Sequence, residues 1–316
     1  MNRAVALLLK AGLSVVLFGW IFRSVDVGQL RSTLAGLSGA TLLIAAALMA
    51  SQGVVLGWRW HRIVQRLGGR LPAGQAIRWV YIGLFFNQAL PTSVGGDVVR
   101  VHYLSRAGSA PGLAFASVAI ERGTGVALMA VMATLCLPAV WGVMGPHSAR
   151  LALALTGPGI VAALVLLAFG SGLLPGWLPS AVAMPLAAFA KGLRQFIACP
   201  LALAEISVLG LASTLAALWA AYLLGHELGI ELPFAAYVTL ATGAVLMSVL
   251  PISLGGWGVR ESVMVALFGS VGVAPERALA LSLVWGVLPL LVSLPGGVLW
   301  WAQSNRVGVG QQEYRE

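Results

Sequence analysis

Long apolar runs separated by short polar segments dominate the chain. Four of them hold about 20 apolar residues each, enough for a helix to cross roughly 30 Å of hydrocarbon. The first run ends at Phe22 and Arg23 without a small-residue cleavage pattern, so we interpret it as an uncleaved span and not as a signal peptide. The whole pattern predicts six spans, at residues 4–22, 39–58, 112–140, 150–170, 198–224 and 278–302.

Composition supports lipid as the solvent. The chain is 59% hydrophobic and 9% charged, whereas ordinary soluble domains are about 25% charged. The net charge of +9 comes from basic residues that border apolar segments, which indicates topology signals and not a nucleic-acid surface. The two cysteines and four histidines have no metal-ligand spacing, so we expect neither a metal nor a cofactor.

A sequence motif occurs twice, 160 residues apart. Residues 90–100 (LPTSVGGDVVR) align without gaps on residues 250–260 (LPISLGGWGVR), with seven of eleven positions identical. The matching proline, serine, glycine pair and arginine indicate duplication. We therefore predict a single all-α membrane domain, a polytopic transmembrane helical bundle over residues 1–316, with related halves at about 1–150 and 151–316.

Each motif lies between two segments that are short for a membrane span. A short helix, a proline, a Gly-Gly reversal and a second short helix are typical of a re-entrant hairpin, which needs protein or a cavity around its irregular backbone. We predict such hairpins at about 76–106 and 233–270, an ordinary interfacial loop being the alternative; the residues that would shape them are Pro91, Gly95, Gly96, Pro251, Gly255 and Gly256. If residues 233–250 instead cross the membrane fully, the number of spans changes, and the side from which the second hairpin enters no longer follows from counting them.

The distribution of basic residues predicts the orientation. With both termini in the cytoplasm, twelve basic residues lie on the cytoplasmic side, including Arg59, Arg70, Arg78 and Arg106, and only four lie outside. Asp26, Glu227, Glu231 and Glu276 fall with the outer group. Three spans between the hairpins then make them enter from opposite sides, as an inverted repeat.

Several ionisable residues lie within or next to apolar segments, where each charge costs on the order of 2.5–3.5 kcal/mol. Arg100 and Arg260 each follow the second glycine of a motif by four residues, behind helix N-termini that favour anions. Two such tips at the bilayer midplane would hold a phosphate between them. The alternative is that these arginines reach the interface or pair with Asp97 and Glu261.

Glu121 and Arg122 are the only charges between Gly112 and Trp141. Adjacent helical residues face about 100° apart, so we expect them to contact different partners, with Glu121 meeting a hairpin arginine or carrying a proton. Glu205, alone in the fifth span, has the same interpretation. Further hydrogen bonds at the tips are expected from Asn87, Ser93 and Ser253, although serine is also a routine helix cap. Flanking tryptophans predict aromatic belts, at Trp58, Trp60, Trp79, Trp300 and Trp301.

Residues 85–100 (FFNQALPTSVGGDVVR), the Glu121-Arg122 pair and residues 250–261 (LPISLGGWGVRE) occur in this order, and together they resemble the membrane domain of the lysylphosphatidylglycerol synthase/flippase family. The resemblance covers nearly the whole chain. It implies movement of lipids such as aminoacylated phosphatidylglycerol between leaflets, with aminoacyl transfer left to a separate soluble domain. It also implies that Arg100, Glu121, Arg122, Arg260 and Glu261 occupy the family's intramembrane polar positions.

The sequence thus favours a flippase-like translocator of an anionic or phosphate-bearing lipid, aminoacylated or polyprenyl-linked lipids included, in a bacterial cytoplasmic membrane. A secondary transporter of a small anion is the alternative, and an intramembrane enzyme acting on lipid phosphates is a third hypothesis. Enzyme signatures such as HExxH, GxSxG and a Walker loop are missing, so we expect no catalysis. The partners to consider are a membrane phospholipid or lipid-linked substrate, a second copy of the chain and a separate lipid-modifying enzyme, but no nucleic acid.

Overall fold

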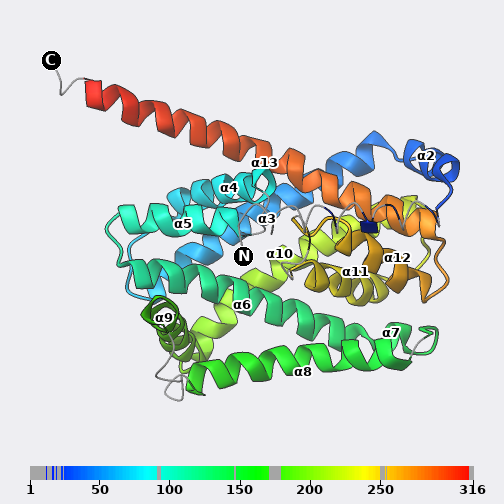
Figure 1. Cartoon of the computed structure of the whole chain (residues 1–316), viewed down its shortest axis with the longest axis horizontal. Coiled ribbons are helices and arrows are strands. Elements are labelled where there is room, and N and C mark those ends of the chain that lie inside the picture. Colours follow the sequence, from blue (N-terminus) through cyan, green and yellow to red (C-terminus); the bar gives the residue numbers. More distant parts are fainter. Residues whose placement is uncertain are drawn as a thin grey trace.

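The computed structural model describes residues 25–90, 94–145, 147–170, 179–249, 253 and 255–312, with five isolated positions before residue 24. All regular secondary structure in this part of the chain is helical (Figure 1). Its helices are α2 (Val27–Ala35), α3 (Gly39–Arg66), α4 (Ala73–Ala89), α5 (Gly95–Arg106), α6 (Pro111–Cys136), α7 (Pro138–Trp141), α8 (His147–Phe169), α9 (Ser180–Ile197), α10 (Pro200–Glu227), α11 (Phe234–Ser248), α12 (Val259–Gly269) and α13 (Pro275–Gln312).

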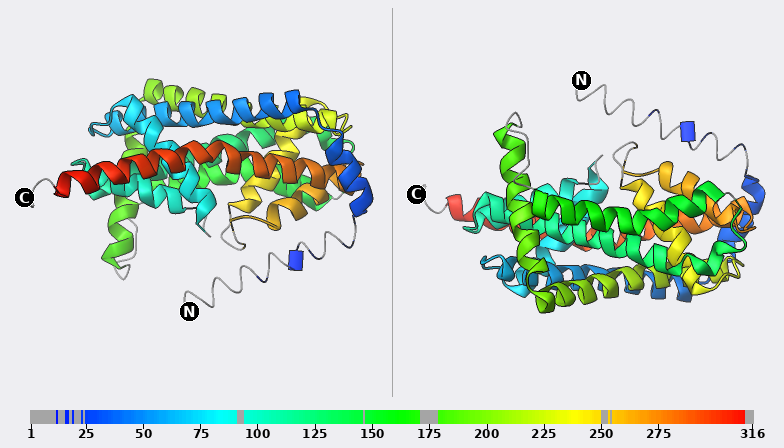
Figure 2. Two further views of the ribbon diagram at one scale, coloured as in Figure 1. Left: turned by 90° about the horizontal axis from the view of Figure 1, so that it is seen from above. Right: turned by 90° about the horizontal axis from the view of Figure 1, so that it is seen from below.

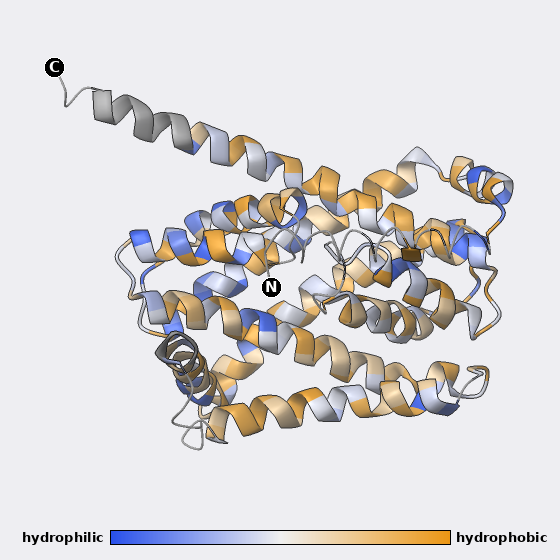
Figure 3. Cartoon of the chain, viewed as in Figure 1, coloured by the Kyte–Doolittle hydropathy of each residue, from blue (hydrophilic) through white to orange (hydrophobic). Residues whose placement is uncertain are grey.

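Within the described part of the chain, five helices are long and apolar enough to cross a membrane: α3, α6, α8, α10 and α13. They match five of the six predicted spans, while the predicted span at 4–22 lies outside the described residues except for isolated positions. Figure 3 shows α8 and the middle of α13 as largely hydrophobic, with hydrophilic residues near helix ends, around α4 and α5, and in the middle of α6. The chain is therefore a multi-pass helical membrane protein, as its hydropathy predicts.

Two pairs of shorter helices carry the repeated motif. The first pair is α4 and α5, and the second is α11 and α12; the two helices of each pair pack against each other. At about 1.5 Å per residue none of the four reaches the roughly 30 Å of hydrocarbon. Figure 1 shows α4 and α5 toward one end of the long axis and α11 and α12 toward the other.

The glycine pairs of the two motifs have different backbone roles. Gly255 and Gly256 have φ angles of 60° and 83°, the left-handed region expected for a chain reversal, and α12 begins three residues later. Gly95 and Gly96, in contrast, already belong to the first turn of α5. A Cβ on Gly96 would lie 1.8 Å from the carbonyl oxygen of Gly83, so glycine is needed there because α5 approaches the backbone of α4. The Gly-Gly reversal predicted for the first motif is thus wrong.

Pro91, Ser93 and Pro251 lie outside the described residues.

Small residues also bring α13 against α4. A Cβ on Gly296 would lie 2.0 Å from the carbonyl oxygen of Tyr81, a contact that only glycine allows. Membrane helices commonly associate in this way, because burial from lipid gives little hydrophobic gain and packing depends on close backbone approach. Figure 2 shows that α9 instead runs across the bundle near one end.

One end of the bundle gathers the loop acids. The Asp26 N–H lies 3.3 Å from Glu276 Oε1, and the Ser38 N–H donates to Glu227 Oε1 at 3.0 Å. Arg277 donates to the Gly229 carbonyl at 2.6 Å. These contacts confirm that Asp26, Glu227 and Glu276 share one side of the protein, and they place Arg277 beside them.

Candidate functional site

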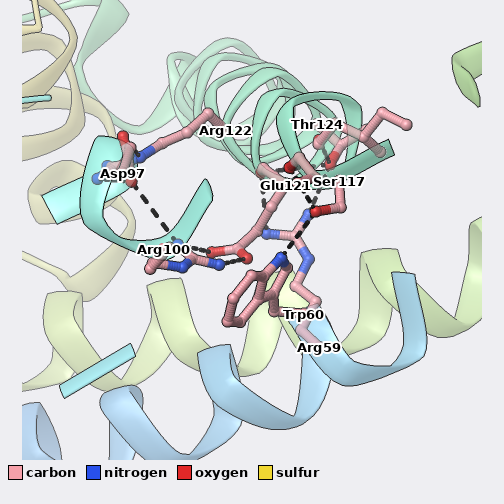
Figure 4. A network of polar contacts seen from close by, with 10 residues as sticks. Arg59, Trp60, Asp97, Arg100, Ser117, Glu121, Arg122 and Thr124 are labelled. Carbon is pink, nitrogen blue, oxygen red and sulfur yellow. Dashed lines mark hydrogen bonds and ion pairs between the residues drawn. The ribbon is translucent and has the colours of Figure 1, made fainter. Parts of the chain in front are cut away.

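A group of charged side chains, buried except for Arg122, joins α3, α5 and α6. We call Arg59, Asp97, Arg100, Glu121 and Arg122 the Arg100 cluster (Figure 4). Arg100 and Glu121 form a two-pronged ion pair, in which Nη1 donates to Oε1 at 3.3 Å and Nη2 to Oε2. Both side chains are 5% exposed. Asp97 Oδ1 lies 3.7 Å from Arg100 Nη1 as a second counter-charge. Glu121 therefore meets an arginine of the first motif, as expected.

Arg122 points away from Glu121 and pairs with Asp97. Its Nε donates to Asp97 Oδ2 at 2.9 Å and its Nη2 to Oδ1 at 3.1 Å. The expectation that the adjacent Glu121 and Arg122 contact different partners is confirmed. With 51% of its side chain exposed, Arg122 is the accessible edge of the Arg100 cluster.

Arg59 belongs to this cluster, although the charge pattern placed it among the topology signals. It is 2% exposed and donates to Thr124 Oγ1 at 2.8 Å and to the Glu121 carbonyl at 3.3 Å. The charge pattern did not predict its burial, although Arg59 lies three residues after Leu56 and four before Ile63, on the face of α3 that packs into the protein. That spacing was the signal in the sequence.

Aromatic packing completes the surroundings of Arg100. Its guanidinium carbon lies 4.2 Å from the centre of the Trp60 ring, and Trp60 Nε1 donates to Ser117 Oγ at 3.0 Å. A cation over an indole is stabilised by the ring quadrupole. Trp60 and Trp79 are buried, so their assignment to an aromatic belt is wrong, whereas Trp58, Trp300 and Trp301 are exposed.

The net charge of the Arg100 cluster is not balanced. Three guanidiniums face two carboxylates, leaving one positive charge when all five groups are ionised. The Nε atoms of Arg59 and Arg100 are buried without a hydrogen-bond partner among the described residues. A buried positive excess of this kind attracts an anion.

The second motif forms a smaller charged group. Arg260 Nε donates to Glu261 Oε1 at 3.0 Å, and the Gly258 N–H donates to Glu261 Oε2 at 2.6 Å, which caps the start of α12. Glu261 is fully buried. The Arg260 guanidinium also lies 4.7 Å from the Trp257 ring centre. Glu261 thus holds Arg260 in place and caps its helix.

A cavity of about 270 Å³ opens beside Arg260. It lies between α3, α6, α10, α11, α12 and α13, and its polar lining comes from Gln52, Thr214 and Ser248. Among the described residues that line it, Arg260 is the only charged one. We call it the Arg260 cavity. Arg100 does not line it, so the charged residue of the cavity comes from the second motif and not from the first.

Residues 7–296 match the family described as the lysylphosphatidylglycerol synthase TM region. The chain belongs to this family. A UPF0104 membrane protein of Methanocaldococcus jannaschii is 35% identical over 83 residues, which cover 26% of this chain and a quarter (25%) of the relative's length.

The family match includes both motifs and all five residues assigned by resemblance to its polar positions. Of the other predicted residues, Asn87 lies near the first motif and its Oδ1 accepts the Gly96 N–H at 2.8 Å. Ser253 is buried, and its hydroxyl has no partner among the described residues.

Glu205, considered for the same roles as Glu121, instead pairs with Arg62 and lies 3.7 Å from Arg66. With 29% of its side chain exposed, it forms an ion pair near the end of α3 and not part of the Arg100 cluster.

Proposed function

We propose that this member of the lysylphosphatidylglycerol synthase TM region family translocates an anionic or phosphate-bearing lipid between leaflets. The observation that supports this proposal is the Arg260 cavity, in which Arg260 is the single charged side chain among apolar and uncharged polar ones. Arg260 Nε and Nη2 donate to Glu261 Oε1, and the remaining N–H groups of the guanidinium can donate to phosphate oxygens.

The volume of the Arg260 cavity fits a lipid headgroup but not a whole lipid. Its volume of about 270 Å³ is at the lower edge of small-molecule sites, which run from about 300 Å³ upward. In our proposal the headgroup enters the Arg260 cavity while the acyl chains stay outside in the bilayer. Glu261 keeps Arg260 oriented, and the hydroxyl and amide groups of Gln52, Thr214 and Ser248 replace part of the headgroup's water.

In this proposal the Arg100 cluster is a second polar site that contacts the headgroup. Its positive excess and the exposed Arg122 suit transient contact with the same phosphate, while the buried Arg100–Glu121 pair holds α5 against α6. We further propose that α4 with α5 and α11 with α12 are re-entrant hairpins of an inverted repeat, since all four are short and the pairs occupy opposite ends of the bundle. Binding and release without bond cleavage account for these groups, so we assign no catalytic residue.

Leaflet exchange of fluorescent phosphatidylglycerol in proteoliposomes, followed by chemical quenching of the outer leaflet, tests this function. Arg260→Gln removes the cation from the cavity and should slow exchange by about tenfold or more, because a hydrogen bond to a charged group contributes about 1.5–3 kcal/mol. The matched control is Arg106→Gln, at the exposed C-terminal end of α5, which should leave the rate unchanged.

Equal rates for wild type and Arg260→Gln would refute the assignment of the Arg260 cavity. Absence of lipid exchange together with uptake of soluble phosphate esters would instead favour a small-anion transporter, the alternative that the same cavity chemistry allows.

A further inference from the structure

A second hollow lies between α3, α4 and α13. Its volume is about 730 Å³, and its lining includes Ala50, Ile77, Arg78, Tyr81 and Leu299. We call it the Arg78 groove. We propose that it binds a phospholipid, with the phosphate diester on Arg78 and an acyl chain along α13.

Arg78 is the reason to expect an anion. It is the only charged residue among those that line the groove in the described structure. Its Nε is buried without a hydrogen-bond partner, and Arg78 forms no ion pair with a described residue. An arginine in a membrane protein is costly unless it is paired, so a ligand that brings a counter-charge is favoured.

The walls of the groove indicate that the ligand also has an apolar part. Apart from Arg78 and Tyr81, all of the lining side chains are apolar or glycine, and the Tyr81 hydroxyl already donates to the Ala50 carbonyl at 2.6 Å. The α13 wall runs from Val292 to Ala302, about 15 Å of helix. One cation at an extended apolar wall fits an anionic lipid better than a free phosphate ion, which would leave that wall without a partner.

The depth of the groove agrees with a lipid phosphate. Trp300 and Trp301 are exposed on the same turn of α13 as the lining residues Leu299 and Ala302. Exposed tryptophans mark the level of the headgroups, where their rings are partly apolar and partly hydrated. In the predicted orientation, this level belongs to the cytoplasmic leaflet.

The Arg78 groove also lies next to the Arg260 cavity. Ala50 lines the groove and its neighbour Met49 lines the Arg260 cavity; on α13, Val292 follows Pro289 of that cavity by three residues. If the proposed translocation is correct, a lipid binds in the Arg78 groove before its headgroup enters the Arg260 cavity. Binding at Arg78 itself does not depend on translocation.

The test is photo-crosslinking of full-length protein in nanodiscs that contain phosphatidylglycerol with a diazirine in one acyl chain, followed by peptide mapping. We expect adducts on α13 between residues 292 and 302. Arg78→Gln should reduce this adduct by about fivefold or more, while Arg78→Lys retains most of it. Arg70→Gln, an exposed arginine before α4, is the matched control and should have no effect.

Two results would overturn the lipid site: adducts distributed equally over all exposed helices, or an α13 adduct that persists in Arg78→Gln. Loss of the adduct in excess inorganic phosphate would mean that a free anion occupies Arg78. Because crosslinking is measured without leaflet exchange, a protein that binds lipid at Arg78 but does not flip it refutes only the proposed function.

Discussion

Replacing Glu121 by glutamine removes the carboxylate that pairs with Arg100 while keeping nearly the same side-chain shape. The Arg100 cluster then holds three guanidiniums and one carboxylate, and its excess rises from one positive charge to two. The remaining carboxylate, Asp97, already accepts both hydrogen bonds from Arg122 and lies 3.7 Å from Arg100. No described group in the cluster replaces the lost charge.

The expected cost follows from burial. Both partners are 5% exposed, and breaking a buried ion pair by removing one partner costs about 3–5 kcal/mol. Glutamine still accepts a hydrogen bond from Arg100, so we expect the lower end, about 3 kcal/mol, and at about 2–4 °C per kcal/mol a fall in Tm of roughly 6–12 °C.

Thermal unfolding in detergent, followed by intrinsic fluorescence, measures this loss. Glu205→Gln is the matched control, because its ion pair with Arg62 is 29% and 32% exposed and should contribute at most about 1 kcal/mol. The double variant Arg100→Gln with Glu121→Gln restores the original excess of one charge and should lose less stability than the sum of the single variants. Equal losses at Glu121 and Glu205, or strictly additive losses in the double variant, would refute the reasoning.

Two glycine substitutions test the close contacts. Gly96→Ala places a Cβ 1.8 Å from the Gly83 carbonyl oxygen and should lower Tm by several degrees, whereas Gly159→Ala, with no atom within 4 Å of the added Cβ, should leave it within about 2 °C; similar midpoints would contradict the packing of α5 on α4. Gly286→Ala places its Cβ 1.9 Å from Arg260 Nη2, the end of a flexible side chain, so we expect slower leaflet exchange with little loss of Tm; an unchanged rate would show that the guanidinium position is not critical.

Much of the architecture follows from the sequence because hydropathy and helix length belong to each segment by itself. Five spans were predicted, each beginning within three residues of the observed helix. The shared side of Asp26, Glu227 and Glu276 follows from counting crossings. The separate partners of Glu121 and Arg122 were also predictable, since adjacent residues on one helix face different directions.

The identity of each partner, in contrast, depends on which helices pack together. The sequence places Arg59 62 positions before Glu121, and only the contact of α3 with α6 makes Arg59, predicted only as a topology signal, a buried member of the Arg100 cluster. The same is true of the two motifs, whose similar sequences lead to different local structures.

Gly96 lies against Gly83 inside a helix pair, whereas Gly256 turns the chain ahead of α12. The sequence by itself determined the membrane class, the spans and the candidate polar residues within them, because those are properties of composition and helical period. Tertiary structure decided that Arg100 is paired within protein while Arg260 lines a cavity, because the surroundings of a side chain are supplied by helices distant in the sequence.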